Sequence, residues 1–346
     1  MGHWGPEQVH AHRGKEKRMA LILGRNDVEQ LLNMEMTMEA VETAFREDGE
    51  GTTQVPERIA LWFEDFHGVI GVMPGYLKGL QAAGVKIICH HEENQPKYGL
   101  PSSAGLVVYH NPLTGMPLAI MDCAYITRMR TGAATGVSAK YLARPDSRVV
   151  GIVGAGAIAL PQIMAIGQVR DLESVKVYDQ DPAAAARLVE AVEAVGLEAQ
   201  TVDSVPDACR EVDVLVTCTP SRSALVRGEW LEEGMHVAAV GADMPHKREL
   251  DPSVYARADK WVTDLVGQAV ITGEIADAMG AGAISKDTLY ATLGQIVAGQ
   301  KVGRENDEEI TVFKSTGMAV QDVATAKKVY ELAVEKGLGV EVSVTP

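Results

Sequence analysis

The stretch Val149-Val150-Gly151-Ile152-Val153-Gly154-Ala155-Gly156-Ala157-Ile158-Ala159 decides the fold. Its first five residues predict a buried strand, and a helix is expected to begin at the end of the stretch. The pattern between them is G-x-G-x-x-A, whose first glycine makes a tight turn and whose second lets a pyrophosphate approach the backbone. The small last residue lets helix and strand pack closely, and the free N–H groups of the helix start attract an anion. A dinucleotide-binding Rossmann unit is therefore predicted, with the pyrophosphate held by Gly154, Gly156, Ala157, Ile158 and Ala159.

Asp179 strengthens this interpretation, because a lone glycine pattern also fits a turn that binds no nucleotide. Residues 174–178 predict a second strand, and Asp179 follows it directly. That is the place where dinucleotide-binding domains carry the acid that binds the ribose 2′-hydroxyl. A 2′-phosphate there would meet a carboxylate, and no Arg or Lys follows directly to attract it. The predicted cofactor is therefore NAD rather than NADP.

The residues around this stretch continue an alternation of strands and helices. Strands are expected at 148–153, 174–178, 198–202, 213–218, 236–240 and 260–263, with helices between them, such as 182–195. Such alternation is typical of a parallel sheet with right-handed crossovers. We therefore assign residues 146–312 to a Rossmann NAD-binding domain that begins after the turn-rich segment 143–147.

The chain before residue 146 predicts an α+β region instead. Helical patterns run through residues 21–50, and the strands of an antiparallel sheet are expected at 59–63, 68–73, 83–89, 105–110 and 117–121. A helix over 126–142 closes this region, and its many small residues permit close packing. A long helix over 319–336 follows the Rossmann domain. The predicted fold class is α/β, with a Rossmann domain and an α+β domain.

The charge and composition of the chain limit its partners. Its net charge is −15, and such an acidic surface repels nucleic-acid phosphates and anionic membranes, so neither is an expected partner. Residues 1–18 are polar and have no apolar stretch after their basic residues, which excludes a secretory signal and predicts a disordered leader. The four cysteines form no C-x-x-C pair, so reduced thiols and a cytoplasmic location are expected.

Several further segments carry a resemblance to a known family. They are Val72-Met73-Pro74-Gly75-Tyr76, Gly84-Val85-Lys86, residues 122–141 with Arg130-Thr131-Gly132-Ala133-Ala134, Gly241-Ala242-Asp243 with Glu249-Leu250-Asp251, Gly273-Glu274-Ile275 and Phe313-Lys314-Ser315-Thr316-Gly317. With the glycine turn, they make the chain resemble the ornithine cyclodeaminase/μ-crystallin family over nearly all of residues 19–346. The resemblance implies a homodimer formed through the non-Rossmann domain. It also implies that this substrate-binding and dimerisation domain is built from both chain ends, 19–145 and 313–346.

The resemblance further implies hydride transfer between the α-carbon of an amino acid and nicotinamide. Arg58 and Arg130 match the positions that bind the substrate carboxylate, a role that suits the planar fork of arginine. Taken alone, each would more often be a surface ion pair. Lys86 lies in the apolar segment 82–88, where a lysine must be paired or functional. By resemblance it contacts the carboxylate or the forming imine, and a lysine reaching out from a sheet edge is the alternative.

Asp243 is the remaining candidate catalytic residue. It follows the predicted strand 236–240 at a carboxyl end, where open α/β sheets bind their ligands. By resemblance it is the acid/base that handles the amino nitrogen and the attacking water. In isolation, an aspartate at such a place is more often a turn residue or a helix cap.

The segment Cys89-His90-His91-Glu92-Glu93 consists of metal-ligand residue types. Adjacent residues on a strand point to opposite faces, however, and no second pair of ligands has matching spacing. We therefore predict no metal site and interpret this segment as an exposed strand end or the rim of a substrate pocket.

The segment Gly71-Val72-Met73 bears on the identity of the substrate. Ornithine cyclodeaminases resemble one another in an acidic residue near this position, which can meet the distal amine, and this chain has none there. The resemblance therefore favours an alanine dehydrogenase or imino-acid reductase that acts on a small amino or imino acid. An ornithine cyclodeaminase that recycles its NAD and a non-catalytic, μ-crystallin-like ligand-binding protein remain alternatives.

Overall fold

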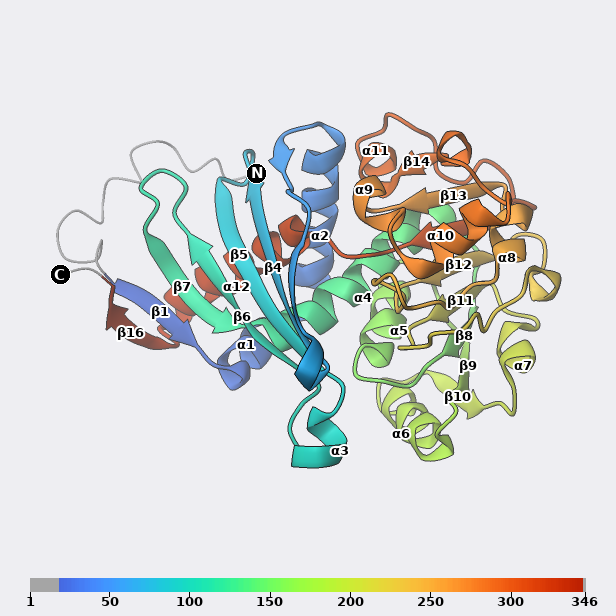
Figure 1. Ribbon diagram of the computed structural model, residues 1–346, viewed down its shortest axis with the longest axis horizontal. Coiled ribbons are helices and arrows are strands. Elements are labelled where there is room, and N and C mark those ends of the chain that lie inside the picture. The colour runs from blue at the N-terminus through green and yellow to red at the C-terminus, as the bar shows by residue number, and fades with distance from the viewer. Residues whose placement is uncertain (1–18, 345–346) are drawn as a thin grey trace. The chain divides into compact units, whose positions relative to one another are not determined.

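The computed structural model describes residues 19–344, so the predicted disordered leader at 1–18 lies outside the described residues. Two compact units form within them. The first unit contains residues 19–32, 54–126 and 322–344, and the second contains 33–53 and 127–321. The first unit thus combines both ends of the described chain. Figure 1 shows the elements of both units in chain order.

The first unit is built on a mixed sheet with the strand order β16-β1-β7-β6-β5-β4-β2, and β3 also pairs with β4. Its strands are β1 (Met19–Leu23), β2 (Thr53–Gln54), β3 (Ile59–Phe63), β4 (Gly68–Leu77), β5 (Ala82–His91), β6 (Ser103–His110), β7 (Pro117–Asp122) and β16 (Val340–Ser343). Its helices are α1 (Arg25–Leu31), a 3-10 turn (Glu64–Phe66), α3 (Asn94–Tyr98) and most of α12 (Ala319–Lys336).

Strands β3 to β7 form antiparallel pairs, as the sequence predicts, but the chain start differs from the expectation. A helical pattern was expected from residue 21, whereas residues 19–23 form strand β1. This strand pairs with β7 in parallel and with β16 in antiparallel orientation. The physical reason is non-local, because β16 comes from the other end of the chain. Local periodicity carries no information about such a pairing.

The second unit is built on a parallel sheet with the order β10-β9-β8-β11-β12-β15-β13-β14. Its strands are β8 (Val149–Val153), β9 (Ser174–Tyr178), β10 (Glu198–Thr201), β11 (Val214–Thr217), β12 (His236–Ala239), β13 (Lys260–Thr263), β14 (Ala291–Thr292) and β15 (Thr311–Lys314). Its helices are α2 (Met34–Gly49), most of α4 (Cys123–Leu142), α5 (Ala159–Gly167), α6 (Pro182–Glu193), α7 (Val205–Cys209), α8 (Pro252–Arg257), α9 (Val266–Ala269), α10 (Gly273–Gly280) and α11 (Leu293–Val297), with 3-10 turns at Gly228–Trp230 and Lys286–Thr288.

The chain order along this sheet reverses between β8 and β11 (Figure 1). In open α/β sheets, ligands bind outside the carboxyl ends of the strands at such a reversal. Each face of the sheet has its own apolar core, because alternate residues of a strand point to opposite faces. Val216 packs in one core with Ile152 and Ile163, and Leu215 packs in the other with Val237. The sheet is therefore covered on both faces, as the Rossmann fold requires.

The limits of the two units differ from the predicted domain boundaries, which lie between residues 145 and 146 and between residues 312 and 313. Helices α2 and α4 belong mainly to the second unit, because small residues bring their backbones close to its other helices. A Cβ atom on Gly136 of α4 would lie 2.7 Å from the Ala165 carbonyl oxygen of α5. A Cβ on Gly49 of α2 would lie 2.0 Å from the Gly294 carbonyl oxygen of α11. Strand β15 extends past residue 312 inside the parallel sheet, which places the residues up to 321 in this unit.

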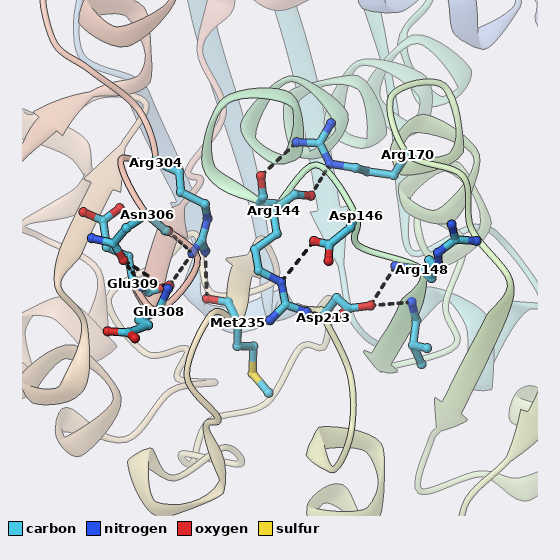
Figure 2. A network of polar contacts seen from close by, with 12 residues as sticks. Arg144, Asp146, Arg148, Arg170, Asp213, Met235, Arg304, Asn306, Glu308 and Glu309 are labelled. Atoms are coloured by element: carbon cyan, nitrogen blue, oxygen red, sulfur yellow. Dashed lines mark hydrogen bonds and ion pairs between the residues drawn. The ribbon is translucent and has the colours of Figure 1, made fainter.

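Two arginines hold the carboxyl end of α4 within the second unit. Figure 2 shows Arg170 directed at backbone carbonyl groups at this helix end, and Arg304 directed at the carbonyl groups of Met235 and of its own loop. Arg170 donates from Nε to the Arg144 carbonyl at 2.7 Å and from Nη2 to the Ala139 carbonyl at 2.7 Å. Arg304 donates from Nε to the Leu142 carbonyl at 2.7 Å. The last carbonyls of a helix have no partner within the helix, so these cations satisfy them and favour its negative end.

His236 of β12 predicts a pH dependence of stability. Its imidazole is buried, with Nε2 3.0 Å from Ser138 Oγ and Nδ1 2.9 Å from Thr311 Oγ1. Burial, followed by the charges of Arg304 and Arg170, lowers the pKa of His236 to about 3. The unfolded chain takes up a proton at this side chain below a pH of about 6.5. Acidification between these two pH values therefore favours the unfolded state, and stability rises again as the pH returns to neutrality.

Through this group, the free energy of unfolding is expected to fall by up to about 1.4 kcal/mol for each pH unit below about 6.5. His236→Gln removes the titrating group and keeps a polar side chain in its place. Denaturant unfolding of both proteins at several mildly acidic pH values should give a flatter slope for the variant. Equal slopes would contradict the assignment of this dependence to His236.

Candidate functional site

The glycine turn of the second unit has the geometry that its sequence predicts. Gly154 has a φ of +104°, and a Cβ there would lie 2.8 Å from Cγ2 of Thr219. A Cβ on Gly156, by contrast, would meet nothing within 4 Å. The first glycine is thus required by the tight turn, and the space over the second is open to a ligand. Helix α5 begins directly afterwards, and its N-cap residue, Ile158, makes no capping hydrogen bond through its side chain.

Asp179 lies beside this turn and helps to fix it. Its Oδ2 accepts a hydrogen bond from the Ala155 N–H at 2.7 Å, and its Oδ1 accepts one from the Asp181 N–H at 2.8 Å. The carboxylate is half-buried. Asp181 in turn caps α6 by accepting from the Ala183 N–H. The structure therefore brings Asp179 to the glycine turn, and the residues of this turn fit the pyrophosphate and ribose of a dinucleotide.

Asp243 lies in the loop after β12, at the carboxyl edge of the same sheet. Its Oδ1 accepts a hydrogen bond from Nζ of Lys247 at 2.8 Å. The Asp243 side chain keeps 29% of its surface exposed, against 13% for Lys247. A partly exposed carboxylate that is held by one cation can both reach a ligand and exchange a proton with it. Lys247 was not among the predicted site residues, because residues 243–247 form a loop, where a spacing of four residues predicts no contact.

A fully buried carboxylate, Glu249, accepts hydrogen bonds from the backbone of the two loops that follow β11 and β12. Its Oε1 accepts from the Thr219 N–H at 2.5 Å, in the loop after β11. Its Oε2 accepts from Oγ1 of Thr217 at 2.9 Å and from the N–H groups of Gly241 at 2.8 Å and Ala242 at 3.2 Å. Burial raises the pKa of Glu249, and so does the nearby Glu274 carboxylate. The sequence predicts no chemical role for Glu249, although this residue lies in one of the segments that carry the family resemblance.

Arg130 is buried on helix α4 in the second unit. Its Nη1 donates to Oε1 of Gln321 at 3.1 Å. The guanidinium packs against Gly317, which has a φ of +79°, and a Cβ there would lie 2.7 Å from Nη1. Fully buried Asp264 holds this turn, because it accepts hydrogen bonds from the N–H groups of Thr316 and Gly317. Arg130 is thus held in a fixed position by residues that follow β13 and β15.

Lys86 is the buried cation of the first unit. Its Nζ lies 3.0 Å from Oδ1 of Asp322 on α12, and both side chains are almost fully buried. The sequence predicts that a lysine in this apolar segment is either paired or functional. The structure confirms that Lys86 is paired. Asp322 was not predicted, because it lies 236 positions away in the sequence.

Arg58 shares a face of the first sheet with Lys86. In the strand register, Met73 lies opposite Lys86, and Gly71 lies two residues before Met73 on the same face. A Cβ on Gly71 would lie 3.6 Å from Cδ of Arg58, so the arginine side chain covers that glycine. The first unit therefore brings together Arg58, Lys86 and the segment that was linked to substrate choice. Glycine and methionine make this part of the face apolar.

The structure contains no group of three or more His, Cys, Asp or Glu residues placed to hold a metal ion within residues 19–344. In the segment 89–93, His90 instead places its Nδ1 2.9 Å from Oγ of Ser103. Over the same described part of the chain, no helix is long and apolar enough to cross a membrane.

Comparison with known proteins identifies the class to which these features belong. Residues 18–337 match the family described as "Ornithine cyclodeaminase/mu-crystallin family", and the chain belongs to this family. It is 46% identical over 319 residues to an alanine dehydrogenase of Archaeoglobus fulgidus, and the match covers 92% of this chain and 97% of the relative.

Two solved structures are similar over nearly the whole chain. One is Δ1-pyrroline-2-carboxylate reductase of Thermococcus litoralis in complex with NADH and L-proline. It has 42% sequence identity and a TM-score of 0.90, and the match covers 93% of this chain and 100% of that one. The other is an archaeal alanine dehydrogenase dimer with bound NAD. It has 45% identity and a TM-score of 0.90, and the match covers 94% and 100% of the two chains.

Proposed function

We propose that this protein is an NAD-dependent oxidoreductase that interconverts a small amino acid and its imine. The observation that carries the proposal is the combination of the open glycine turn with Asp179 and the Asp243–Lys247 pair at the carboxyl edge of the same sheet. The similarity to an alanine dehydrogenase and to an imino-acid reductase supports the same reaction class.

The proposed cofactor is NAD. When bound, its nicotinamide accepts a hydride from the amino acid or returns one to the imine. The backbone at Gly156 leaves room for the pyrophosphate, and the N–H groups at the start of α5 favour its negative charge. Asp179 supports NAD over NADP, because a carboxylate accepts hydrogen bonds from a 2′-hydroxyl and repels a 2′-phosphate.

We assign the substrate carboxylate to Arg58 and Arg130 and the carboxylate or forming imine to Lys86. The fixed guanidinium of Arg130 supports its part of this assignment, because the planar fork of arginine can pair with a carboxylate through two hydrogen bonds. Lys86 is already paired with Asp322, so the role proposed for it rests on the family to which the chain belongs. Asp243 is the proposed acid/base. It would accept a proton from the amino nitrogen, or from the water that attacks the imine, and Lys247 would hold the carboxylate in place.

A small, apolar substrate side chain is the simplest consequence of the face around Gly71 and Met73. An ornithine cyclodeaminase needs a group that positions the distal amine, and neither residue can pair with an ammonium. Asp322 lies near this face, but it already forms an ion pair with Lys86. Alanine, or the imine derived from pyruvate, is therefore the proposed substrate class. The cyclisation of ornithine is the second candidate.

The reaction class is tested by a screen in both directions. Purified protein is mixed with each of a set of amino acids and NAD, and with each of a set of 2-keto acids, ammonia and NADH. We expect a small amino acid to reduce NAD and its keto acid to oxidise NADH, with slower reactions when NADP or NADPH is used. A lack of activity with every pair would overturn the proposal.

We further propose a homodimer formed through the first unit, since the archaeal alanine dehydrogenase to which this chain is similar is a dimer. Ile59, Val72, Ile87 and Leu106 lie opposite one another across strands β3 to β6. This row lies on the face away from Lys86, and Ile59 and Leu106 remain 57% and 47% exposed. Adjacent exposed aliphatic side chains of this kind are typical of a protein interface.

Ile87→Glu combined with Leu106→Glu is therefore expected to convert a dimer into a monomer, because two carboxylates per subunit would be buried without partners. Light scattering after size-exclusion chromatography measures the mass. Leu113→Glu is the matched control, since Leu113 is 81% exposed in the turn between β6 and β7. A double variant that keeps the mass of the wild-type dimer would refute this interface.

We also propose a cytoplasmic location, in line with the cysteines. Cys89, Cys123, Cys209 and Cys218 are all free thiols, as is usual in a reducing compartment.

A further inference from the structure

A second buried carboxylate lies behind Glu249 and fixes its backbone. Oε2 of Glu274 accepts hydrogen bonds from the N–H groups of Glu249 at 2.9 Å and Leu250 at 3.3 Å. Its Oε1 accepts from the Tyr255 hydroxyl at 2.7 Å and lies 3.0 Å from Nζ of Lys314 at the end of β15. All of these side chains are buried. Glu249, Glu274 and Lys314 therefore form one ionic network, which we call the edge network.

Stability alone does not account for the edge network. Two carboxylates and one ammonium lose their hydration when they are buried, and well-packed apolar side chains often stabilise a fold as well as or better than such a group of charges. The ionic groups instead fix the orientation of the groups around them, because each N–H and O–H donor must point at a carboxylate oxygen. The donors to Glu249 come from two separate loops, the one after β11 and the one after β12.

Those two loops are the ones that matter for the proposed reaction. The Thr219 loop packs against the cofactor turn, since a Cβ on Gly154 would lie 2.8 Å from Cγ2 of Thr219. In the other loop, Ala242 donates its N–H to Glu249, and the next residue is Asp243. Glu249 thus ties the backbone next to Asp243 to the backbone that lies against the cofactor turn.

We infer that Glu249 is a positioning residue, which holds Asp243 at a fixed place relative to the cofactor turn, with Glu274 and Lys314 as its support. The inference rests on the proposed function, in which Asp243 is the acid/base. Glu249 itself is fully buried within the loops that it joins and acts through the backbone. Reacting groups that are misplaced by about 1 Å can lose about 100-fold in rate.

The test is Glu249→Gln, which keeps the shape of the side chain but replaces one acceptor oxygen with an NH2 group. The control is Asp213→Asn at the opposite edge of the same sheet, where Oδ2 of Asp213 accepts from the N–H groups of Arg148 at 2.7 Å and Val149 at 2.9 Å. Both variants lose a carboxylate that anchors backbone. Only Glu249 joins the loop that carries Asp243.

The measurements are kcat and KM for the amino acid, the NADH dissociation constant from fluorescence, and the melting temperature. We expect Glu249→Gln to lower kcat by about 10- to 100-fold, with a much smaller change in NADH affinity. Asp213→Asn should lower the melting temperature and leave kcat unchanged. Loss of kcat in both variants in proportion to their loss of stability, or an unchanged kcat in Glu249→Gln, would overturn the inference.

Thr217 supplies a second pair of variants in case Glu249→Gln does not fold. Thr217→Val removes the hydroxyl that donates to Glu249, and Thr217→Ser keeps it. We expect Thr217→Ser to retain more of the wild-type kcat than Thr217→Val, and equal values would contradict the inference. A wild-type protein without activity would overturn the proposed function together with this inference, whereas active wild type and equally active variants would overturn the inference alone.

Discussion

Asp243→Asn is expected to lower kcat by about 10²- to 10⁴-fold, the range that a positioned acid/base contributes. The reason is chemical rather than structural, because the asparagine oxygen can still accept the hydrogen bond from Lys247 but cannot exchange a proton. Steady-state kinetics with the amino acid found in the screen measure kcat, and NADH fluorescence measures cofactor binding. NADH binding should stay close to that of the wild type.

The matched control for this variant is Asp251→Asn. Asp251 lies downstream of Asp243 in the segment between β12 and α8, and it caps α8 by accepting from the Ser253 N–H at 2.9 Å. Its loss should cost stability at the helix start and leave kcat unchanged. If Asp243→Asn kept most of its activity, Asp243 would not be the acid/base. A similar loss in both variants would point to a structural effect on the whole segment.

Arg130→Lys is expected to damage the use of the amino acid far more than the use of NAD. Lysine keeps the charge but loses the planar fork that pairs with a carboxylate through two hydrogen bonds. It also loses the packing of the guanidinium against Gly317 and its geometry towards Gln321. We expect a loss of about 1.5–3 kcal/mol in kcat/KM for the amino acid, the range for hydrogen bonds to charged groups.

The control is a comparison of two sets of kinetic measurements on the same variant. The kinetics are measured once with the amino acid varied at saturating NAD and once with NAD varied at saturating amino acid. If the loss appeared mainly in the KM for NAD, the assignment of Arg130 to the substrate carboxylate would be wrong.

The parts of the fold that local sequence specifies were predicted closely. The strands at 59–63, 174–178 and 260–263 and the helix at 319–336 begin and end where the sequence predicts. These segments have clear apolar periodicity and nearby turn residues. The structure differs where the deciding contact is distant. Residues 19–23 form a strand because they pair with residues 340–343.

In the candidate site, too, the sequence predicts the features that depend on local residues and misses those that depend on distant contacts. The glycine turn and Asp179 could be predicted because their chemistry lies within one strand–turn–helix unit. The burial of Lys86 could be predicted from its apolar neighbours, whereas its partner, Asp322, could not, since no local pattern links the two residues. Glu249 and Glu274 lie in segments that carry the family resemblance, but no local pattern predicts what their side chains contact. Only the fold reveals that both are fully buried and bind backbone N–H groups of the loops.

Whether the reaction consumes NAD, as in a dehydrogenase, or only recycles it, as in a cyclodeaminase, can be decided in a single experiment. Alanine and ornithine are supplied separately with NAD, while NADH is followed by absorbance and ammonia is assayed in the same samples. Oxidation of alanine releases pyruvate and ammonia, and water supplies the keto oxygen, so we predict NADH and ammonia in equal amounts. Proline formed from ornithine with only catalytic NAD, and no NADH from any small amino acid, would contradict this reaction in favour of a cyclodeaminase.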